Sequence, residues 1–133
     1  MIDTSVLVAY ERAQLKSQED WRERVPAASV MAAVSVFELR LGALLGSPGR
    51  RRESRVRFLS DVRAIVPVLP FDAAAAEIMA DLYVRLRRAG GLIGERDLQI
   101  AATALVAGHE VMTLNVSEFA RIPELVLRPF EQA

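Results

Sequence analysis

Short apolar runs alternate with longer stretches of helical periodicity along the chain. Strands are expected where the short apolar runs fall, near residues 1–8, 28–34, 64–70, 109–114 and 125–130. Helical patterns fill most of the intervals between them. Because strands that alternate with helices form a parallel sheet covered on both faces, the pattern predicts an α/β fold. We expect a three-layer α/β/α sandwich around a central, mainly parallel sheet of about five strands.

Two helices have clear boundaries in the sequence. Asp72 is expected to cap a helix over residues 73–89, in which apolar residues recur at intervals of three and four before a Gly-Gly pair. Residues 97–107 predict a second helix, rich in small residues and ended by Gly108. Both helices are long enough to cover a sheet.

The remaining breaks are predicted to be loops inside one domain. The stretch Gly46-Ser47-Pro48-Gly49 is expected to join two helices. Pro67 cannot donate a hydrogen bond to a neighbouring strand, so its strand should lie at an edge of the sheet. No repeat, low-complexity segment or linker interrupts the sequence, and we expect a single domain over residues 1–133.

Composition narrows the class of protein. The chain has 133 residues, 52% of them hydrophobic, and no cysteine, which suits a globular domain without disulfides or thiolate metal sites. No apolar run reaches the roughly 18 residues of a membrane span, and the first residues lack the pattern of a signal peptide. We expect a cytoplasmic protein that does not enter a membrane.

The charge is balanced, but it is unevenly composed. The formal net charge is zero, and 16 of the 17 basic residues are arginine. One arginine cluster lies within residues 50–57 and another within residues 85–88. These clusters are either solvated helix faces and loops, or phosphate contacts that form a basic rim around an acidic centre.

The single histidine restricts the possible chemistry. Because His109 has no second histidine to work with, a two-histidine ribonuclease mechanism is excluded. A Ser-His-Asp triad would also depend on this residue, which lies in an expected link between a helix and a strand. Carboxylates are therefore the expected catalytic groups.

Four polar residues fall at the end of an expected strand or at the start of the helix that follows. They are Asp3, Glu38, Asp97 and Asn115. In an open parallel sheet these positions line one edge, where ligands bind. Segments distant in sequence are thus expected to bring three carboxylates and an amide together.

Each of the four also has a purely structural interpretation. Ser35-Val36-Phe37-Glu38 has the pattern of a capping box, and Asp97 suits the positive end of a helix dipole. Asn115 is a common turn residue. Asp3 could cap the turn through the two hydroxyl residues that follow it.

Clustered carboxylates repel one another unless a cation lies between them. With no cysteine and one histidine in the chain, the available ligands are oxygens, which suit Mg²⁺ or Mn²⁺. Such an ion can polarise a phosphoryl oxygen and supply a nucleophile. An acidic centre with a possible arginine rim therefore points to a phosphodiester hydrolase.

Three stretches carry a family resemblance that runs nearly end to end. They are IDTSVLVAY, VSVFELRLGAL and GLIGERDLQIAATALVAGHEVMTLNVSEFARIPELVL. They resemble PIN-domain ribonucleases, and most closely the VapC toxins of bacterial type II toxin–antitoxin modules. The resemblance implies a Mg²⁺-dependent endoribonuclease, with Mn²⁺ able to substitute, that cuts tRNA or ribosomal RNA and inhibits translation. It also implies a homodimer and an inhibitory VapB antitoxin, with operator DNA bound only through the antitoxin.

The resemblance assigns roles to particular residues. Asp3, Glu38 and Asp97 match the metal-binding acids of the family, and Asn115 falls where members have Asp or Asn. Glu118 is expected to contribute through water. Small hydroxyl residues beside the site are expected to orient a carboxylate or a water, and they are Thr4, Ser5 and Thr113.

The chain departs from the family pattern in two ways. Members usually have several apolar residues before the first acid, whereas Asp3 has two, so either the first strand is short or native residues precede Met1. Asn115 in place of Asp lowers the charge of the site by one. We therefore expect one firmly bound ion, and a second present mainly with substrate.

Three alternatives to a nuclease are weighed on sequence features. A catalytically degenerate PIN domain could act as an RNA- or protein-binding module, and retention of all three acids argues against it. A haloacid-dehalogenase-like phosphatase needs a carboxylate two positions after the first, where this chain has Ser5. A receiver domain needs a lysine at a late strand end, and the only lysine is Lys16.

Overall fold

The computed structural model describes residues 1–17 and 20–130. Its helices are α1 (Thr4–Ser17), the 3₁₀ helix η1 (Trp21–Arg24), α2 (Ala33–Leu45), α3 (Arg50–Ile65), α4 (Ala73–Arg88), α5 (Glu95–Ala107) and α6 (Val116–Phe119). Its strands are β1 (Met31–Ala32), β2 (Val68–Leu69), β3 (Val111–Met112) and β4 (Leu127–Arg128). Within the described part, no helix is both long and apolar enough to cross a membrane.

The strands form a short parallel sheet that the first residues of the chain hold together. β1 pairs with β2, β3 pairs with β4, and both pairings are parallel. Ile2 lies between the two pairs, because its N–H donates to the Val30 carbonyl at 2.8 Å and it forms a parallel bridge with Met112. The order across the sheet is therefore β2, β1, residues 1–3, β3, β4, and β2 pairs only with β1 among the described residues. This confirms the edge position predicted from Pro67.

Alternate residues along the strands point into two separate hydrophobic cores. Met1, Ala32 and Val111 belong to one core, whereas their neighbours in sequence, Ile2, Met31 and Met112, belong to the other. This two-residue period is expected of a sheet buried on both faces. It confirms the predicted three-layer α/β/α architecture.

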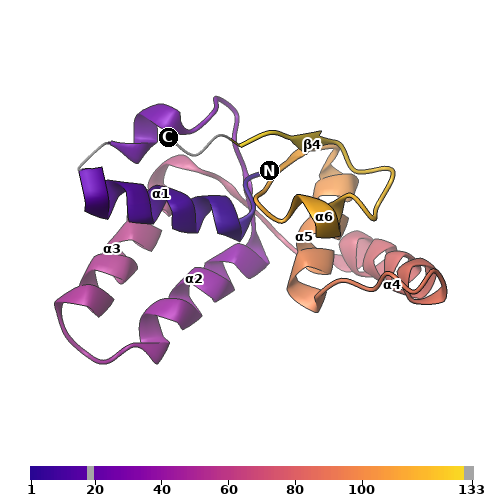
Figure 1. The fold of residues 1–133 in the computed structure, drawn as a ribbon, viewed down its shortest axis with the longest axis horizontal. Coiled ribbons are helices and arrows are strands. Elements are labelled where there is room, and N and C mark those ends of the chain that lie inside the picture. Colours follow the sequence, from indigo (N-terminus) through magenta and orange to yellow (C-terminus); the bar gives the residue numbers. More distant parts are fainter. Residues whose placement is uncertain (18–19, 131–133) are drawn as a thin grey trace.

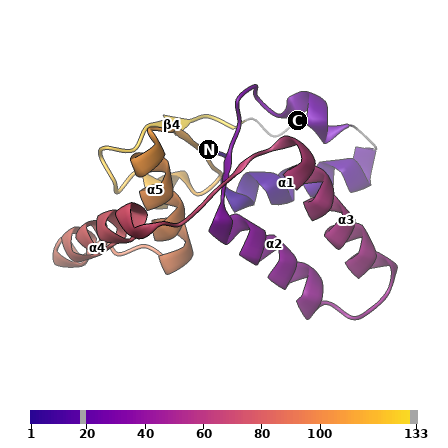
Figure 2. The same ribbon diagram turned by 180° about the vertical axis from the view of Figure 1, so that it is seen from behind.

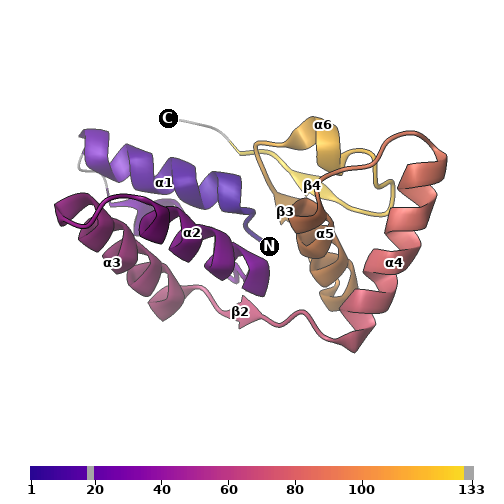
Figure 3. The same cartoon turned by 90° about the horizontal axis from the view of Figure 1, so that it is seen from below.

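The helices divide between the two faces of the sheet. α1, η1 and α3 contribute to the core that contains Ile2, and α4 and α5 to the core that contains Met1. Figure 3 shows the strands between the group α1–α3 and the group α4–α5, and Figures 1 and 2 show the same division from two sides. The sheet edge at the start of α1, α2 and α5 lies where these two groups meet.

The predicted first strand over residues 1–8 is wrong beyond Asp3. Helix α1 begins at Thr4, and the Asp3 carbonyl accepts hydrogen bonds from the N–H groups of Val6 and Leu7. The apolar run that suggested a strand provides the buried face of this helix, with Val6, Leu7 and Tyr10 at most 1% exposed. A short apolar run does not by itself distinguish a buried strand from a buried helix.

The other predicted elements hold with shifted boundaries. The Asp72 side chain caps α4 by accepting the Ala75 N–H at 2.9 Å, as expected. α5 begins at Glu95, two residues before the predicted start. It ends at Ala107 and is capped by Gly108, whose φ of 71° suits glycine. The segment from Gly46 to Gly49 joins α2 to α3 as predicted.

Two arginines of the first cluster serve local structure. Arg52 donates to the Leu44 and Gly46 carbonyls, and so satisfies the end of α2. Arg55 donates to the Gly42 carbonyl at 2.7 Å and lies 3.7 Å from Glu11. For these two residues the interpretation as a basic rim around the acids is wrong.

Candidate functional site

Asp3 lies where the chain leaves the sheet and enters α1, and its side chain is buried, with 1% exposed. The hydroxyls of Ser5 and Thr113 donate to its Oδ2 at 2.6 and 2.7 Å. The same two hydroxyl oxygens accept the N–H groups of Leu114 and Asn115. Hydrogen bonds of this kind offset the cost of burying a carboxylate and fix its orientation.

Glu38 projects from the second turn of α2 toward the start of α1. Thr4 Oγ1 donates to Glu38 Oε1 at 2.9 Å, and Arg96 Nη1 lies 3.9 Å from Glu38 Oε2. Burial raises the pKa of Glu38, and the hydrogen bond from Thr4 opposes that rise; the charge of Asp3 raises the pKa further, and Arg96 lowers it. The charge of Asp3 therefore acts on Glu38 through space, without a hydrogen bond between their side chains.

The capping-box interpretation of Glu38 is wrong. The N-cap of α2 is Ala32, which makes no side-chain capping bond, and Ser35 lies inside the helix. Glu38 is instead tied to the neighbouring helix α1. Its position thus leaves its carboxylate at the meeting point of α1, α2 and α5.

Asp97 is the third residue of α5 and carries the most perturbed carboxyl of the site. Its pKa is raised from 3.8 to about 7, first by burial and then by a hydrogen bond with the Glu118 side chain. The negative charges of Asp3, Glu118 and Glu38 raise it further. The fold thus places Asp3, Glu38 and Glu118, from three other segments of the chain, close enough to Asp97 for their charges to raise its pKa.

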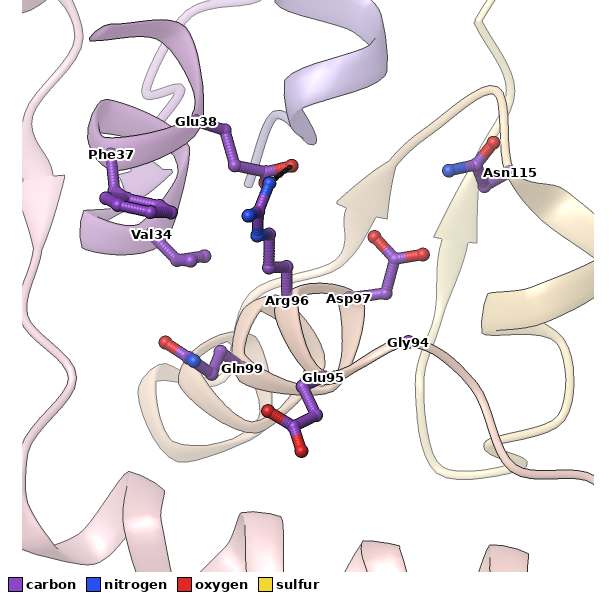
Figure 4. Close-up of a pocket in the computed structure, with 9 residues that line it drawn as sticks. All are labelled: Val34, Phe37, Glu38, Gly94, Glu95, Arg96, Asp97, Gln99 and Asn115. Atoms are coloured by element: carbon purple, nitrogen blue, oxygen red, sulfur yellow. Dashed lines mark ion pairs between the residues drawn. The ribbon is translucent and has the colours of Figure 1, made fainter. Parts of the chain in front are cut away.

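Asn115 occupies the N-cap position of α6 but makes no capping bond with its side chain. It lines a pocket of about 720 Å³ together with Glu38 and Asp97. Figure 4 shows these side chains around the pocket, with Arg96 against Glu38 and Glu95 pointing away from both acids. Asp3 does not line the pocket, and its link to Asn115 runs through Thr113.

Arg96 and Phe37 were not singled out from the sequence, yet both line this pocket. The Arg96 guanidinium lies 5.0 Å from the centre of the Phe37 ring, so it contacts both an aromatic face and Glu38. One sequence signal was available for Arg96. A cation in the first turn of a helix is disfavoured by the helix dipole, which makes its presence beside Asp97 notable.

The carboxylate oxygens of these acids are suitable ligands for a divalent cation, but the side chains do not converge on a common metal position. Among residues 1–17 and 20–130, no three Asp, Glu, His or Cys side chains are arranged so that they could hold a metal ion together. The contacts give a reason, because Oδ2 of Asp3 faces two hydroxyls and Glu38 faces Thr4 and Arg96. The ligand set is oxygen only, and burial together with the charges of the neighbouring acids raises the pKa of Asp97, which a cation would oppose. The residues therefore fit Mg²⁺ or Mn²⁺ if Glu38 turns away from Arg96.

The sequence matches the PIN domain family over residues 1–125, and the chain belongs to that family. Within it, the chain is similar to VapC proteins. It is 31% identical to Ribonuclease VapC of Rickettsia bellii over 125 residues, which cover 94% of this chain and 91% of the relative. It is 35% identical to VapC ribonuclease Y4jK of Sinorhizobium fredii over 106 residues, which cover 77% of this chain and 76% of the relative.

Solved structures share the fold. The structure of VapBC2 from Rickettsia felis bound to a promoter DNA fragment matches with a TM-score of 0.82 at 22% identity, over 98% of each chain. The structure of VapBC-1 from nontypeable Haemophilus influenzae matches with a TM-score of 0.79 at 27% identity, over 97% of this chain and 96% of the other. Both likenesses extend over essentially the whole chain, which agrees with the PIN fold expected from the sequence.

Proposed function

We propose that this chain is a VapC-type toxin, a Mg²⁺-dependent endoribonuclease that hydrolyses phosphodiester bonds of tRNA or ribosomal RNA and so inhibits translation. The observation that carries the proposal is the pocket at the sheet edge, where the negative charges of Asp3, Glu38 and Glu118 raise the pKa of Asp97. Similarity to VapC ribonucleases at 31% and 35% identity supports the reaction class. Oxygen ligands without cysteine support Mg²⁺, with Mn²⁺ as a substitute.

Asp3, Glu38 and Asp97 would hold the metal. A divalent cation bound there supplies polarisation of a phosphoryl oxygen and a lowered pKa for water. Ser5 and Thr113 hold the Asp3 carboxylate in one orientation, and Thr4 does the same for Glu38. Preorganised charges of this kind stabilise a transition state because they need not reorganise when the reaction occurs.

The polar residues at the far side of the pocket have supporting roles in this proposal. Asn115 offers an amide that can donate to or accept from the RNA or a water. Glu118 raises the pKa of Asp97 through a side-chain hydrogen bond and its negative charge, and we propose that it contributes to the site through a water. We therefore assign Asn115 to the catalytic set and not to the metal ligands.

The proposal includes partners. Its solved relatives are described as VapBC, one of them bound to promoter DNA. We propose that this chain is neutralised by a VapB-type antitoxin, forms a homodimer and a toxin–antitoxin hetero-oligomer, and reaches operator DNA only through the antitoxin. It would act in the cytoplasm as a single PIN domain over residues 1–133.

RNA cleavage tests the proposal. Total RNA is incubated with the purified chain in Mg²⁺, in EDTA, and in EDTA followed by excess Mn²⁺, and the new ends are sequenced. Cleavage at defined sites that stops in EDTA, returns with Mn²⁺ and is absent in Asp97→Asn supports the nuclease. Cleavage that continues in EDTA overturns the metal-dependent mechanism.

The second candidate is a catalytically degenerate PIN domain that binds RNA or protein. The absence of a preassembled three-acid metal site among the described residues favours it. Calorimetry with Mn²⁺ separates the two. Heat of binding that disappears in Asp97→Asn supports the nuclease, whereas no heat with the wild-type chain supports the binding module.

A further inference from the structure

An acidic catalytic pocket repels its own substrate. RNA is a polyanion, and proteins that bind it obtain most of their affinity from cations that contact phosphates. Several arginines of this chain are engaged elsewhere, in ion pairs or in hydrogen bonds to backbone carbonyls, and they include Arg52, Arg55, Arg85, Arg96 and Arg128. The cations that attract RNA should therefore be sought on another surface beside the pocket.

A second cavity of about 250 Å³ runs along the exposed side of α1. Arg12, Lys16 and Arg24 line it, and none of the described residues that line it is acidic. Arg12 and Lys16 are exposed, and no ion pair to either is found among residues 1–17 and 20–130. This α1 groove is thus a basic surface in a chain whose net charge is zero.

The cations of the groove are held in line by local structure. Arg12 and Lys16 lie two and three turns after Ser5 on one side of α1, and the stripe from Ser5 to Lys16 is about 16 Å long at 1.5 Å per residue. The Arg24 guanidinium lies 5.5 Å from the centre of the Tyr10 ring and 5.7 Å from that of the Phe130 ring. Stacking on two rings positions Arg24 at the opposite wall.

The groove and the acidic pocket adjoin through the residues that follow β3. Ser5, at the inner end of the groove, donates to Asp3 at 2.6 Å and accepts the Leu114 N–H at 3.1 Å. Leu114 lines the groove, and the next residue, Asn115, lines the acidic pocket. An RNA strand that passes over Leu114 and Asn115 would therefore run from the acids of the pocket to the basic residues of the groove.

We propose that the α1 groove binds the backbone phosphates of the RNA strand adjacent to the cleaved bond. Arg12 and Arg24 suit this role because a guanidinium fork binds phosphate oxygens in pairs, and Lys16 adds a point charge. The exposed apolar side chain of Leu114 and the ring of Phe130 offer surfaces for sugars and bases. The choice of RNA as the ligand rests on the proposed function. The test of the groove measures binding alone and does not require that the chain cleaves RNA.

The test compares two double variants with the same loss of charge. Arg12→Ala/Lys16→Ala removes two cations of the groove, and Arg63→Ala/Arg88→Ala removes two exposed cations on α3 and α4. Binding of a fluorescent single-stranded RNA oligomer is measured by anisotropy in EDTA, across a range of salt concentrations. The groove variant should lose at least about tenfold in affinity, and the slope of log K against log salt should fall by about 1.4, or about 0.7 for each phosphate contact. The control should change less than about threefold.

Several outcomes overturn the proposal. They are wild-type RNA affinity in the groove variant, an equal loss in the control, and no RNA binding by the wild-type chain. Poly-glutamate binding is measured in parallel. If the groove variant binds poly-glutamate more weakly than wild type but binds RNA equally well, the groove is a site for an acidic protein segment and not for RNA.

Cleavage kinetics separate this proposal from the proposed function. If the wild-type chain cleaves RNA, the groove variant should raise KM and leave kcat unchanged, because its acids are intact. If the wild-type chain binds RNA through the groove but never cleaves it, the nuclease proposal fails and the groove stands.

Discussion

Replacing Asp97 by asparagine should stabilise the metal-free protein above neutral pH while it abolishes cleavage. The pKa of Asp97 is raised from 3.8 to about 7 by burial, Glu118 and the charges of its neighbours. An acid whose pKa is raised by folding binds its proton more tightly in the folded state. The free energy of unfolding therefore falls as the pH rises from about 4 to about 7, and it stays lowered above that range. Asparagine carries no such proton and avoids the loss.

The magnitude follows from the size of the shift and the exposure of the side chain. Taken at full weight, the shift corresponds to about 4 kcal/mol. Asp97 is only partly buried, so solvent screens its repulsion from the other acids, and about 1–2 kcal/mol is a better expectation. For a chain of this length, that difference raises Tm by about 3–8 °C.

Thermal unfolding in EDTA at about pH 4 and about pH 8 measures this effect, with Glu95→Gln as the control. Glu95 lies on the same helical turn but points away from the acids (Figure 4), so its replacement should leave Tm nearly unchanged. Asp97→Asn should unfold above the wild-type chain at the higher pH and close to it at the lower. Added Mg²⁺ should narrow the gap, because the cation stabilises the wild-type acids. An Asp97→Asn variant with a Tm at or below wild type at the higher pH refutes the reasoning.

Three further changes test other contacts. Thr113→Val removes a donor to Asp3 and the acceptor of the Asn115 N–H, and it should cost about 1–3 kcal/mol in urea unfolding; an unchanged midpoint would contradict this. Arg96→Ala frees Glu38 of its cation and should strengthen Mn²⁺ binding in calorimetry, whereas weaker binding would show that Arg96 assists the metal. Asp72→Ala removes the cap of α4 and should lower stability by about 1 kcal/mol without changing the rate of RNA cleavage per folded molecule; a lowered rate would link α4 to the site.

The fold was predictable wherever local signals and tertiary packing agree. α4 and α5 have caps or terminal glycines that fix their ends within two residues of the prediction. The first strand failed because residues 6–9 are apolar throughout, and their period does not distinguish a strand from a helix. The strands are each two residues long, so their neighbours in the predicted ranges belong to loops or to helix starts.

The site was predictable in its position but not in its contacts. Asp3, Glu38 and Asp97 could be found because the topology of a parallel sheet places strand ends together. The hydrogen bond from Thr113 to Asp3 joins residues 110 positions apart, and it depends on rotamers that no local pattern specifies. The pairing of Glu38 with Arg96 is also a rotamer choice. It turns the Glu38 carboxylate toward a cation of the protein itself, which helps to explain why no three acids among the described residues are arranged to hold a metal ion.

The rate of RNA cleavage as a function of Mg²⁺ concentration, measured under single-turnover conditions, tests the central claim most directly. Asp3→Asn, Glu38→Gln and Asp97→Asn are compared with wild type and with Glu95→Gln, an acid of the same pocket that points away from the others. Each of the three site variants should lose more than about 100-fold in rate at saturating Mg²⁺, because each removes a carboxylate that would hold the cation. Glu95→Gln should stay within about threefold of wild type. Equal rates for wild type and Asp97→Asn, or a rate independent of Mg²⁺, would contradict the assignment of these acids as a metal-dependent ribonuclease centre.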